Sequence, residues 1–136
     1  MFDVVTFGSA VVDAFISTNT AEKGKLICYN LGEKVLIDDL RFDIGGGATN
    51  TAVAFSRLGL RAGCICKIGK DDNGDRILGL LSKEKIKFLG CVNEKGMSGY
   101  SVILNSKEKN RTVLTYKGVN DELGFKEIKK KIETKW

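Results

Sequence analysis

The sequence predicts an α/β fold: a parallel sheet with flanking helices, joined by a small second sheet. Short apolar runs alternate with segments of helical spacing along much of the chain, as in parallel sheets whose strands are connected through helices. Two β-rich runs near the C-terminal end flank a polar turn, which is typical of a hairpin and breaks that alternation. The 136 residues, 43% of them hydrophobic, are enough for one domain with a core.

The main layer is expected to alternate strands and helices. Ala48, Ala52, Phe55 and Leu58 recur at helical spacing, and Gly59 ends the run. Apolar segments before and after the helical ones indicate buried strands. In chain order, the expected elements are a strand over 3–8, a helix over 48–58, a strand over 62–68, a helix over 75–85 and a strand over 86–92.

The second sheet is expected to be inserted in this α/β layer. Val35, Ile37 and Leu40 alternate with more polar positions, as in a half-exposed strand. Residues 17–33 are polar and indicate a loop, and Asp13 is an acid inside an otherwise apolar extended segment. The expected strands of the second sheet lie near 10–16, 34–42, 99–105 and 112–117.

The basic excess of the chain is concentrated at its C-terminal end. The net charge is +5, but residues 126–136 hold five lysines against two glutamates, which leaves +2 for the first 125 residues. Phe125, Ile128, Ile132 and Trp136 form an apolar stripe on one face of an expected helix, with the lysines elsewhere. A solvated helix face explains these lysines, so we expect no nucleic-acid surface.

Residue types that are absent exclude several classes of enzyme. The chain contains no histidine, which excludes Ser-His-Asp triads, Cys-His proteases and zinc sites with histidine ligands. Its four cysteines do not match a Cys-x-x-Cys pattern, and we expect reduced core thiols. Residues 1–16 lack a basic region and a bilayer-length apolar run. We therefore expect a cytoplasmic protein without a membrane segment.

The glycine cluster at 45–47 is the strongest local signal for a ligand site. Three successive glycines followed by a helix let backbone amides approach a ligand closely. No lysine follows at the spacing of a P-loop, and Asn50 stands where a dinucleotide fingerprint needs its third glycine. Two interpretations stay open: a structural turn with Asn50 capping the helix, or a site for a polyhydroxylated molecule that uses Asp13 and Asn50.

Four motifs together resemble the N-terminal portion of the ribokinase family, also called PfkB carbohydrate kinases. The run GGGATNTAVA at 45–54, continuing to Arg57-Leu58-Gly59, is similar to the signature of that family. The other three motifs are GSAVVD at 8–13, IGKDDNGD at 68–75, and the hairpin over 99–117 followed by GVN at 118–120. The resemblance implies a ribokinase-like parallel sheet with flanking helices plus a small β lid, present here as an incomplete, N-terminal part of the fold.

The resemblance also implies a function for this part of the fold. Members transfer the γ-phosphoryl group of ATP, with Mg²⁺, to a hydroxyl of a sugar, a sugar phosphate or a nucleoside. By position, Asp13 would bind two sugar hydroxyls, Gly45 and Gly46 would present backbone to the ring, and Asn50 would bind another hydroxyl. Gly47 departs from members that carry a substrate-contacting side chain there, which leaves the identity of the sugar open.

The catalytic part of the family's pattern is missing from this sequence. The catalytic aspartate of the family lies in a Gly-Ala-Gly-Asp motif, which the chain does not contain. We therefore assign no catalytic residue and no metal ligand, and place the ATP and Mg²⁺ sites outside these residues. The isolated chain is expected to be inactive. The alternative is a non-catalytic sugar-binding or dimerisation module, because lids of this family often join two subunits into a homodimer.

Overall fold

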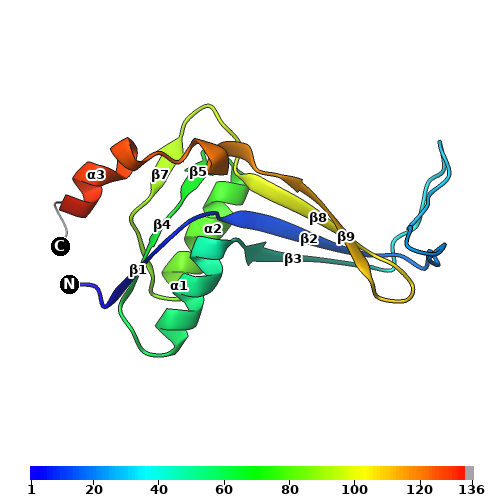
Figure 1. Cartoon of the computed structure of the whole chain (residues 1–136), viewed down its shortest axis with the longest axis horizontal. Coiled ribbons are helices and arrows are strands. Elements are labelled where there is room, and N and C mark those ends of the chain that lie inside the picture. Colours follow the sequence, from blue (N-terminus) through cyan, green and yellow to red (C-terminus); the bar gives the residue numbers. More distant parts are fainter. Residues whose placement is uncertain (134–136) are drawn as a thin grey trace.

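The computed structural model describes the backbone of residues 1–133 and the side chains of residues 1–129. It has two parts, which Figure 1 shows next to each other: a layered α/β body and a longer four-stranded sheet that extends from it. The polar segment between the second and third strands lies at the far end of that sheet. We call these two parts the body and the four-stranded sheet.

The body is built from short parallel strands and two helices. Its elements are β1 (Val4–Phe7), α1 (Gly47–Arg57), β4 (Ala62–Ile65), β5 (Lys67–Gly69), α2 (Asp72–Lys83), β6 (Lys87–Phe88) and β7 (Cys91–Asn93). The strands pair in parallel, in the order β1-β4-β6 and, in a second ladder, β5-β7. The alternation of strands and helices that the sequence predicts is therefore confirmed.

Two of the expected strands are each divided in two. The segment 62–68 is interrupted at Cys66, and the segment 86–92 is interrupted at residues 89–90. Backbone hydrogen bonds still cross the interruption, from Leu89 N to Cys64 O at 2.9 Å and from Cys91 N to Cys66 O at 3.0 Å. A β-carbon at Gly90 would overlap the backbone of Cys66. The division reflects this close crossing, which apolar periodicity does not reveal.

Apolar clusters lie on both faces of the body because successive residues of a strand point to opposite sides. The larger cluster includes Cys64, Cys66 and Ile68 from the strands, Ala52 from α1, and Ile77 and Leu81 from α2. The smaller one joins Ile65 and Leu89 to Ile128 of α3 (Phe125–Glu133). Helices therefore cover the two faces, with α1 and α2 on one side and α3 on the other.

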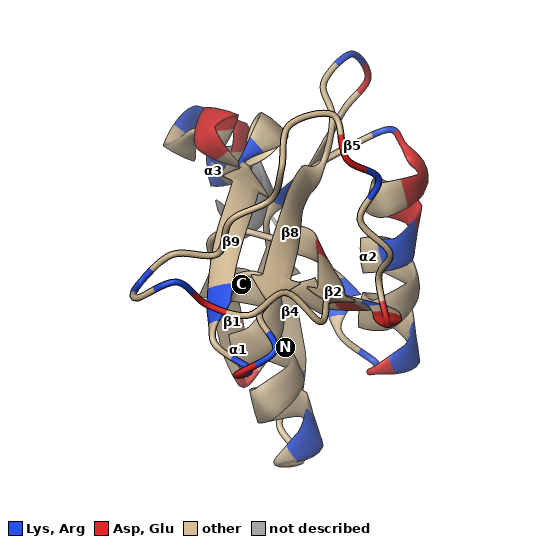
Figure 2. Ribbon diagram, turned by 90° about the vertical axis from the view of Figure 1, so that its right-hand side faces the viewer, with Lys and Arg blue, Asp and Glu red and all other residues tan. Residues whose placement is uncertain are grey.

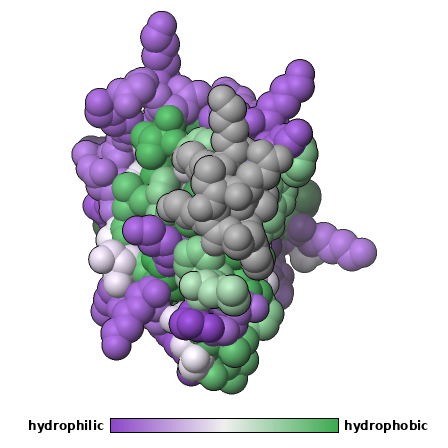
Figure 3. Space-filling view, turned by 90° about the vertical axis from the view of Figure 1, so that its left-hand side faces the viewer, coloured by the Kyte–Doolittle hydropathy of each residue, from purple (hydrophilic) through white to green (hydrophobic). Residues whose placement is uncertain are grey.

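Helix α3 bears out its expected apolar stripe only in part. Ile128 is buried, but Phe125 is 68% exposed, while the side chains of Ile132 and Trp136 lie outside the described residues. Lys67, nearly buried on the same face, donates to Glu127 Oε1 at 2.8 Å and so ties the helix to β5. Figure 3 looks onto this end of the molecule, where apolar side chains gather between charged ones.

The four-stranded sheet has the order β3-β2-β8-β9. Its strands are β2 (Val11–Ser17), β3 (Asp39–Gly45), β8 (Gly99–Asn105) and β9 (Arg111–Tyr116). Strands β2 and β8 are parallel, and the two outer pairs are antiparallel. A 3-10 turn, η1 (Gly118–Glu122), leads from β9 to α3.

The strand expected over 34–42 is wrong in its position. Pairing with β2 runs from Val11 opposite Gly45 to Ser17 opposite Asp39, so the strand covers 39–45. Asp38 N still donates to Ser17 O at 2.8 Å, but residues 34–37 lie outside the pairing with β2, and Leu36 is 82% exposed. The alternating apolar residues before residue 39 have the pattern of a strand, but an apolar pattern does not determine which residues pair with a neighbouring strand. The other three expected strands, near 10–16, 99–105 and 112–117, are observed at 11–17, 99–105 and 111–116.

The four cysteines differ in their burial. Cys64 and Cys66 are buried, but Cys28 is exposed, which corrects the expectation of four core thiols. Figure 2 shows positions of lysine and arginine interspersed along the ribbon with positions of aspartate and glutamate. Among the described residues, each helix is too short or too polar to cross a membrane.

Candidate functional site

A row of polar side chains crosses one face of the four-stranded sheet. Asp13 of β2 lies opposite Asp43 of β3 on one side and Ser101 of β8 on the other. Ser101 in turn lies opposite Thr115 of β9, and their hydroxyl oxygens are 3.2 Å apart. Side chains of directly opposite residues point to the same face. We call these four residues, Asp43, Asp13, Ser101 and Thr115, the polar row.

Asp13 is the most unusual member of the polar row because a carboxylate is held there partly out of water. Burial raises the pKa of Asp13; a hydrogen bond with Ser101 opposes this, and the nearby charge of Asp43 adds to it. The ion pairs among the described residues do not include Asp13. The neighbouring residues of β2, Val12 and Ala14, are buried on the opposite face. Asp13 is thus a carboxylate on a paired strand that has a hydrogen bond with Ser101 but no ion-pair partner among the described side chains.

The glycine turn lies directly beside the Asp13 carboxylate. A β-carbon at Gly45 would overlap Asp13 Oδ2, so glycine leaves the space that this carboxylate occupies. Gly46 has a φ of 105°, and a β-carbon there would overlap the backbone of Ser9. These two positions therefore require glycine for different reasons: clearance for an acid at Gly45, and backbone conformation with close approach at Gly46.

The amide groups at the start of α1 are bound by Ser9. Gly46 is the N-cap residue and makes no side-chain capping bond. Ser9 accepts from Gly47 N through its hydroxyl at 3.1 Å and from Ala48 N through its carbonyl at 3.0 Å. Asn50 lies inside the first turn of α1, so the alternative interpretation, in which its side chain caps the helix, is wrong.

Asn50 is exposed and faces the β3 side of the glycine turn. It lines a cavity of about 390 Å³ that is also lined by Asp43 and Arg57. Asp13 is not among the lining residues. Asp43 is therefore the link between the two predicted polar ligands, as the cross-strand partner of Asp13 and a cavity neighbour of Asn50. Asp43 was not predicted as a site residue, although its position two residues before Gly45 places both residues on the same face of β3.

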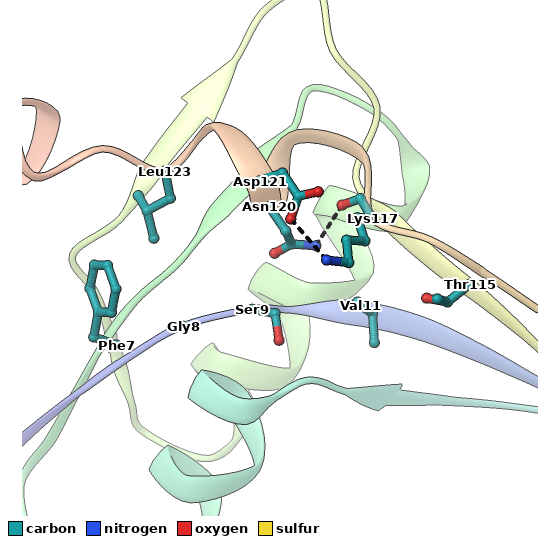
Figure 4. Close-up of a pocket in the computed structure, with 9 residues that line it drawn as sticks. All are labelled: Phe7, Gly8, Ser9, Val11, Thr115, Lys117, Asn120, Asp121 and Leu123. Carbon is teal, nitrogen blue, oxygen red and sulfur yellow. Dashed lines mark hydrogen bonds and ion pairs between the residues drawn. The ribbon is translucent and has the colours of Figure 1, made fainter. Parts of the chain in front are cut away.

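A second cavity, of about 400 Å³, lies where the four-stranded sheet joins the body (Figure 4). It is lined from β1 and the following turn by Phe7, Gly8 and Ser9, from the sheet by Val11 and Thr115, and from the segment after β9 by Lys117, Asn120, Asp121 and Leu123. Val11 and Thr115 point to the same sheet face as Asp13. The cavity therefore lies at the body end of the polar row.

Asp71, just before α2, is half-buried, whereas Asp72 and Asp75 in the first turn of that helix are exposed. Asp71 caps α2 by accepting from Gly74 N at 2.8 Å, and it also accepts from Ser98 Oγ at 2.6 Å and Ser98 N at 2.8 Å. Burial raises the pKa of Asp71, but these hydrogen bonds outweigh it and the pKa lies below its ordinary value. Asp71 thus holds the start of β8 against α2.

The parallel α/β body joins the four-stranded sheet through the glycine turn, and the polar row lies on one face of that sheet. The family model described as pfkB family carbohydrate kinase matches residues 1–135, and the chain belongs to that family. Ribokinase of Mus musculus is 27% identical over 129 residues, which is 93% of this chain and 38% of that protein. The resemblance to the ribokinase family is therefore confirmed.

Solved structures show the same fold. Ribokinase of Giardia lamblia superposes with a TM-score of 0.79 at 18% identity. The superposition includes 98% of this chain and 39% of the Giardia chain. Ribokinase of Arabidopsis thaliana, complexed with ribose and ATP, gives a TM-score of 0.68 at 19% identity and covers 85% of this chain and 36% of its own. The chain spans about a third of the length of the curated relatives that it matches.

Metal ligands were not expected in this part of the fold. Among the side chains that the structure describes, no group of three or more histidine, cysteine, aspartate or glutamate residues is placed to hold a metal ion. Asp13 and Asp43 form a pair of carboxylates, of which Asp43 also contacts Arg41 at 3.4 Å. Carboxylate oxygens accept hydrogen bonds, so both acids are able to accept from hydroxyl groups.

Proposed function

We propose that this chain is the sugar-binding part of an ATP-dependent carbohydrate or nucleoside kinase that transfers the γ-phosphoryl group of ATP to a substrate hydroxyl. Asp13 binds two adjacent hydroxyls, Gly45 and Gly46 present backbone to the ring, and Asn50 binds a further hydroxyl. The observation that carries this proposal is the half-buried Asp13 carboxylate beside Gly45, in the polar row of the four-stranded sheet. In this proposal the four-stranded sheet acts as the lid over the substrate of a cytoplasmic enzyme.

The contribution of these residues to phosphoryl transfer would be positioning. This reaction asks for little covalent chemistry from the protein and depends on holding the acceptor hydroxyl in line with the phosphate. A carboxylate accepts hydrogen bonds from two hydroxyls at once, and a fixed strand holds it in one orientation. ATP and Mg²⁺ would bind to residues outside this chain, and the catalytic base would also be one of those residues. The chain alone is therefore expected not to phosphorylate sugars.

The proposal is tested by measuring sugar affinity of the purified chain and of Asp13→Asn with ligand-observed NMR over a panel of free sugars and nucleosides. A hydrogen bond to a charged group contributes roughly 1.5 to 3 kcal/mol, so the variant should bind about 10- to 100-fold more weakly. Asp39→Asn is the matched control, since it removes the same charge from β3 at its far end. Equal affinity of the wild-type chain and Asp13→Asn would contradict the proposal.

Catalysis by the isolated chain is a separate question with its own test. ATP, Mg²⁺ and each sugar are incubated with the purified chain, and ADP formation is followed. We expect no sugar-dependent ADP. Sugar-dependent ADP formation that Asp13→Ala abolishes would show that these residues hold a complete active site.

A second candidate function is a non-catalytic module that binds sugar or pairs with a second copy through the four-stranded sheet. The face opposite the polar row supports it, since Phe42 of β3 and Leu114 and Tyr116 of β9 are each about half exposed there. Within residues 1–133, no further strand pairs with the outer edge of β3 or of β9. Sedimentation at increasing concentration separates the candidates: a homodimer that Leu114→Lys disrupts favours pairing through this face, and a monomer excludes it.

A further inference from the structure

The side chain of Asn120 in η1 pairs with the backbone of one residue far away in the sequence. Its Oδ1 accepts from Ala10 N at 2.9 Å, and its Nδ2 donates to Ala10 O at 3.0 Å. The same Nδ2 donates to Lys117 O at 2.9 Å (Figure 4). The amide therefore mimics a strand partner, since it donates to and accepts from a single residue. Aspartate has the same shape but, when ionised, cannot donate.

Ala10 directly precedes β2 and lies just outside the strand pairing of the four-stranded sheet. Pairing of β2 with both of its neighbours begins at Val11, and Asp13 follows three residues after Ala10. Ala10 itself is completely buried. A β-carbon at Gly99 would overlap Asn120 Nδ2, so the first residue of β8 leaves room for this amide. The Asn120 amide thus fixes the position at which β2 begins at the edge of the body.

The other side of the same junction is fixed by the glycine turn. Ser9 accepts from the amides of Gly47 and Ala48 at the start of α1. Asn50 lies on the first turn of that helix. Ser9 and Ala10 are therefore held from two directions, by the helix that carries Asn50 and by the turn that carries Asn120.

The turn that carries Asn120 is itself rigidly placed. Val119 is buried, and its N–H donates to Met97 O at 3.0 Å. Gly118 adopts a φ of 55° close to the backbone of Met97 and Ser98, where a β-carbon would overlap. Because this turn is fixed, the two hydrogen bonds from Asn120 also hold the backbone of Ala10 in place.

We infer that Asn120 is a positioning residue of the sugar site: through Ala10 it sets where β2 begins relative to the glycine turn, and so sets the spacing between the Asp13 carboxylate and the Asn50 amide. This inference rests on the proposed function. Asn120 does not contact the sugar in it. A ligand that must meet two polar groups at once loses affinity when their spacing shifts.

The test is a double-mutant cycle on sugar affinity. Asn120→Ala and Asn120→Asp are measured in the wild-type chain and in Asp13→Asn, with the tightest-binding free sugar of the panel as the probe and ligand-observed NMR as the readout. We expect each Asn120 variant to weaken binding about 5- to 20-fold in the wild-type chain and less than about 2-fold in Asp13→Asn, because coupled residues are non-additive. Asn120→Asp keeps the shape of the side chain, so it serves if Asn120→Ala does not fold.

A loss of stability alone would not produce this coupling. Ser98→Ala is the matched control, because Ser98 is also a buried polar residue that ties two segments, Gly69 and Asp71 on one side and β8 on the other. It should lower the unfolding midpoint while changing sugar affinity less than about 2-fold. Equal effects of the Asn120 variants in both backgrounds, or no effect in either, would overturn the inference. If Asp13→Asn alone leaves affinity unchanged, or if no free sugar binds, the proposed function fails and the inference fails with it.

Discussion

The body and the four-stranded sheet are held together in different ways. All four residues of β4 are buried, whereas all six residues of β9 are exposed. Burial on both faces specifies a body strand through its side chains. The outer strand β9 depends instead on pairing with β8, whereas the inner strand β2 also contributes Val12 to the larger apolar cluster. The part of the molecule that carries the candidate site is therefore the less deeply packed one.

The largest expected difference between the two parts concerns side-chain packing. Ile77 of α2 is fully buried in the body, so Ile77→Ala should lower the free energy of unfolding by about 3 kcal/mol. Leu114 of β9 is 57% exposed, and Leu114→Ala should change it by no more than about 0.5 kcal/mol. Chemical denaturation of both variants measures this. Similar losses in the two variants would mean that a second surface covers β9 in solution.

A smaller effect is expected at Asp71, where α2 of the body meets the start of β8. Asp71→Ala removes a helix cap and leaves Ser98 without its acceptor, so unfolding should become easier by about 2 kcal/mol. Asp72→Ala, next along the chain and exposed, should cost about 0.5 kcal/mol. The same denaturation experiment compares the two, and equal values would contradict this role of Asp71.

The effect of Asp71 should also depend on pH in a known direction. The pKa of Asp71 in the folded chain lies below its ordinary value, because its hydrogen bonds outweigh burial. The folded state then favours the ionised form, so the stabilisation is complete above the ordinary aspartate pKa and is lost as pH falls through the folded pKa. The difference between wild type and Asp71→Ala should shrink on acidification. A difference that grows instead would refute this sign.

The smallest expected effect concerns Asp13 and has the opposite sign. Burial raises the pKa of Asp13, so the folded state disfavours its ionised form. The resulting cost is absent at low pH, appears as pH rises through the ordinary aspartate pKa, and is complete above the folded pKa. Asp13→Asn should therefore stabilise the chain at neutral pH by a few tenths of a kcal/mol, a small value because solvent screens the charge. A destabilised variant would show that Asp13 is structural.

Asp43 offers an independent check on the same carboxylate. The charge of Asp43 contributes to raising the pKa of Asp13, so Asp43→Asn should lower that pKa. A carboxyl-carbon NMR titration reads the change directly. An unchanged pKa would mean that the two carboxylates of the polar row do not interact.

The sequence was sufficient for the elements that burial specifies and for the residues of the glycine turn. The alternation of strands and helices followed from apolar spacing, and Asp13, Gly45 and Gly46 do lie together. The segment 34–42 failed because its apolar alternation has no partner strand before residue 39. Asp43, Asp71 and Asn120 were missed as site or junction residues because their roles depend on hydrogen bonds or register between distant segments, which local pattern does not encode.

The most direct test of the sugar site is an amide chemical-shift map of the ¹⁵N-labelled chain as the best-binding sugar is added. We predict that the largest shifts fall at Asp13, Gly45, Gly46 and Asn50, with smaller ones at Ser101, and that Asp13→Asn reduces them all. Shifts confined to the body around β4 and α3, or no shifts with any free sugar or nucleoside, would contradict a sugar site on the polar row.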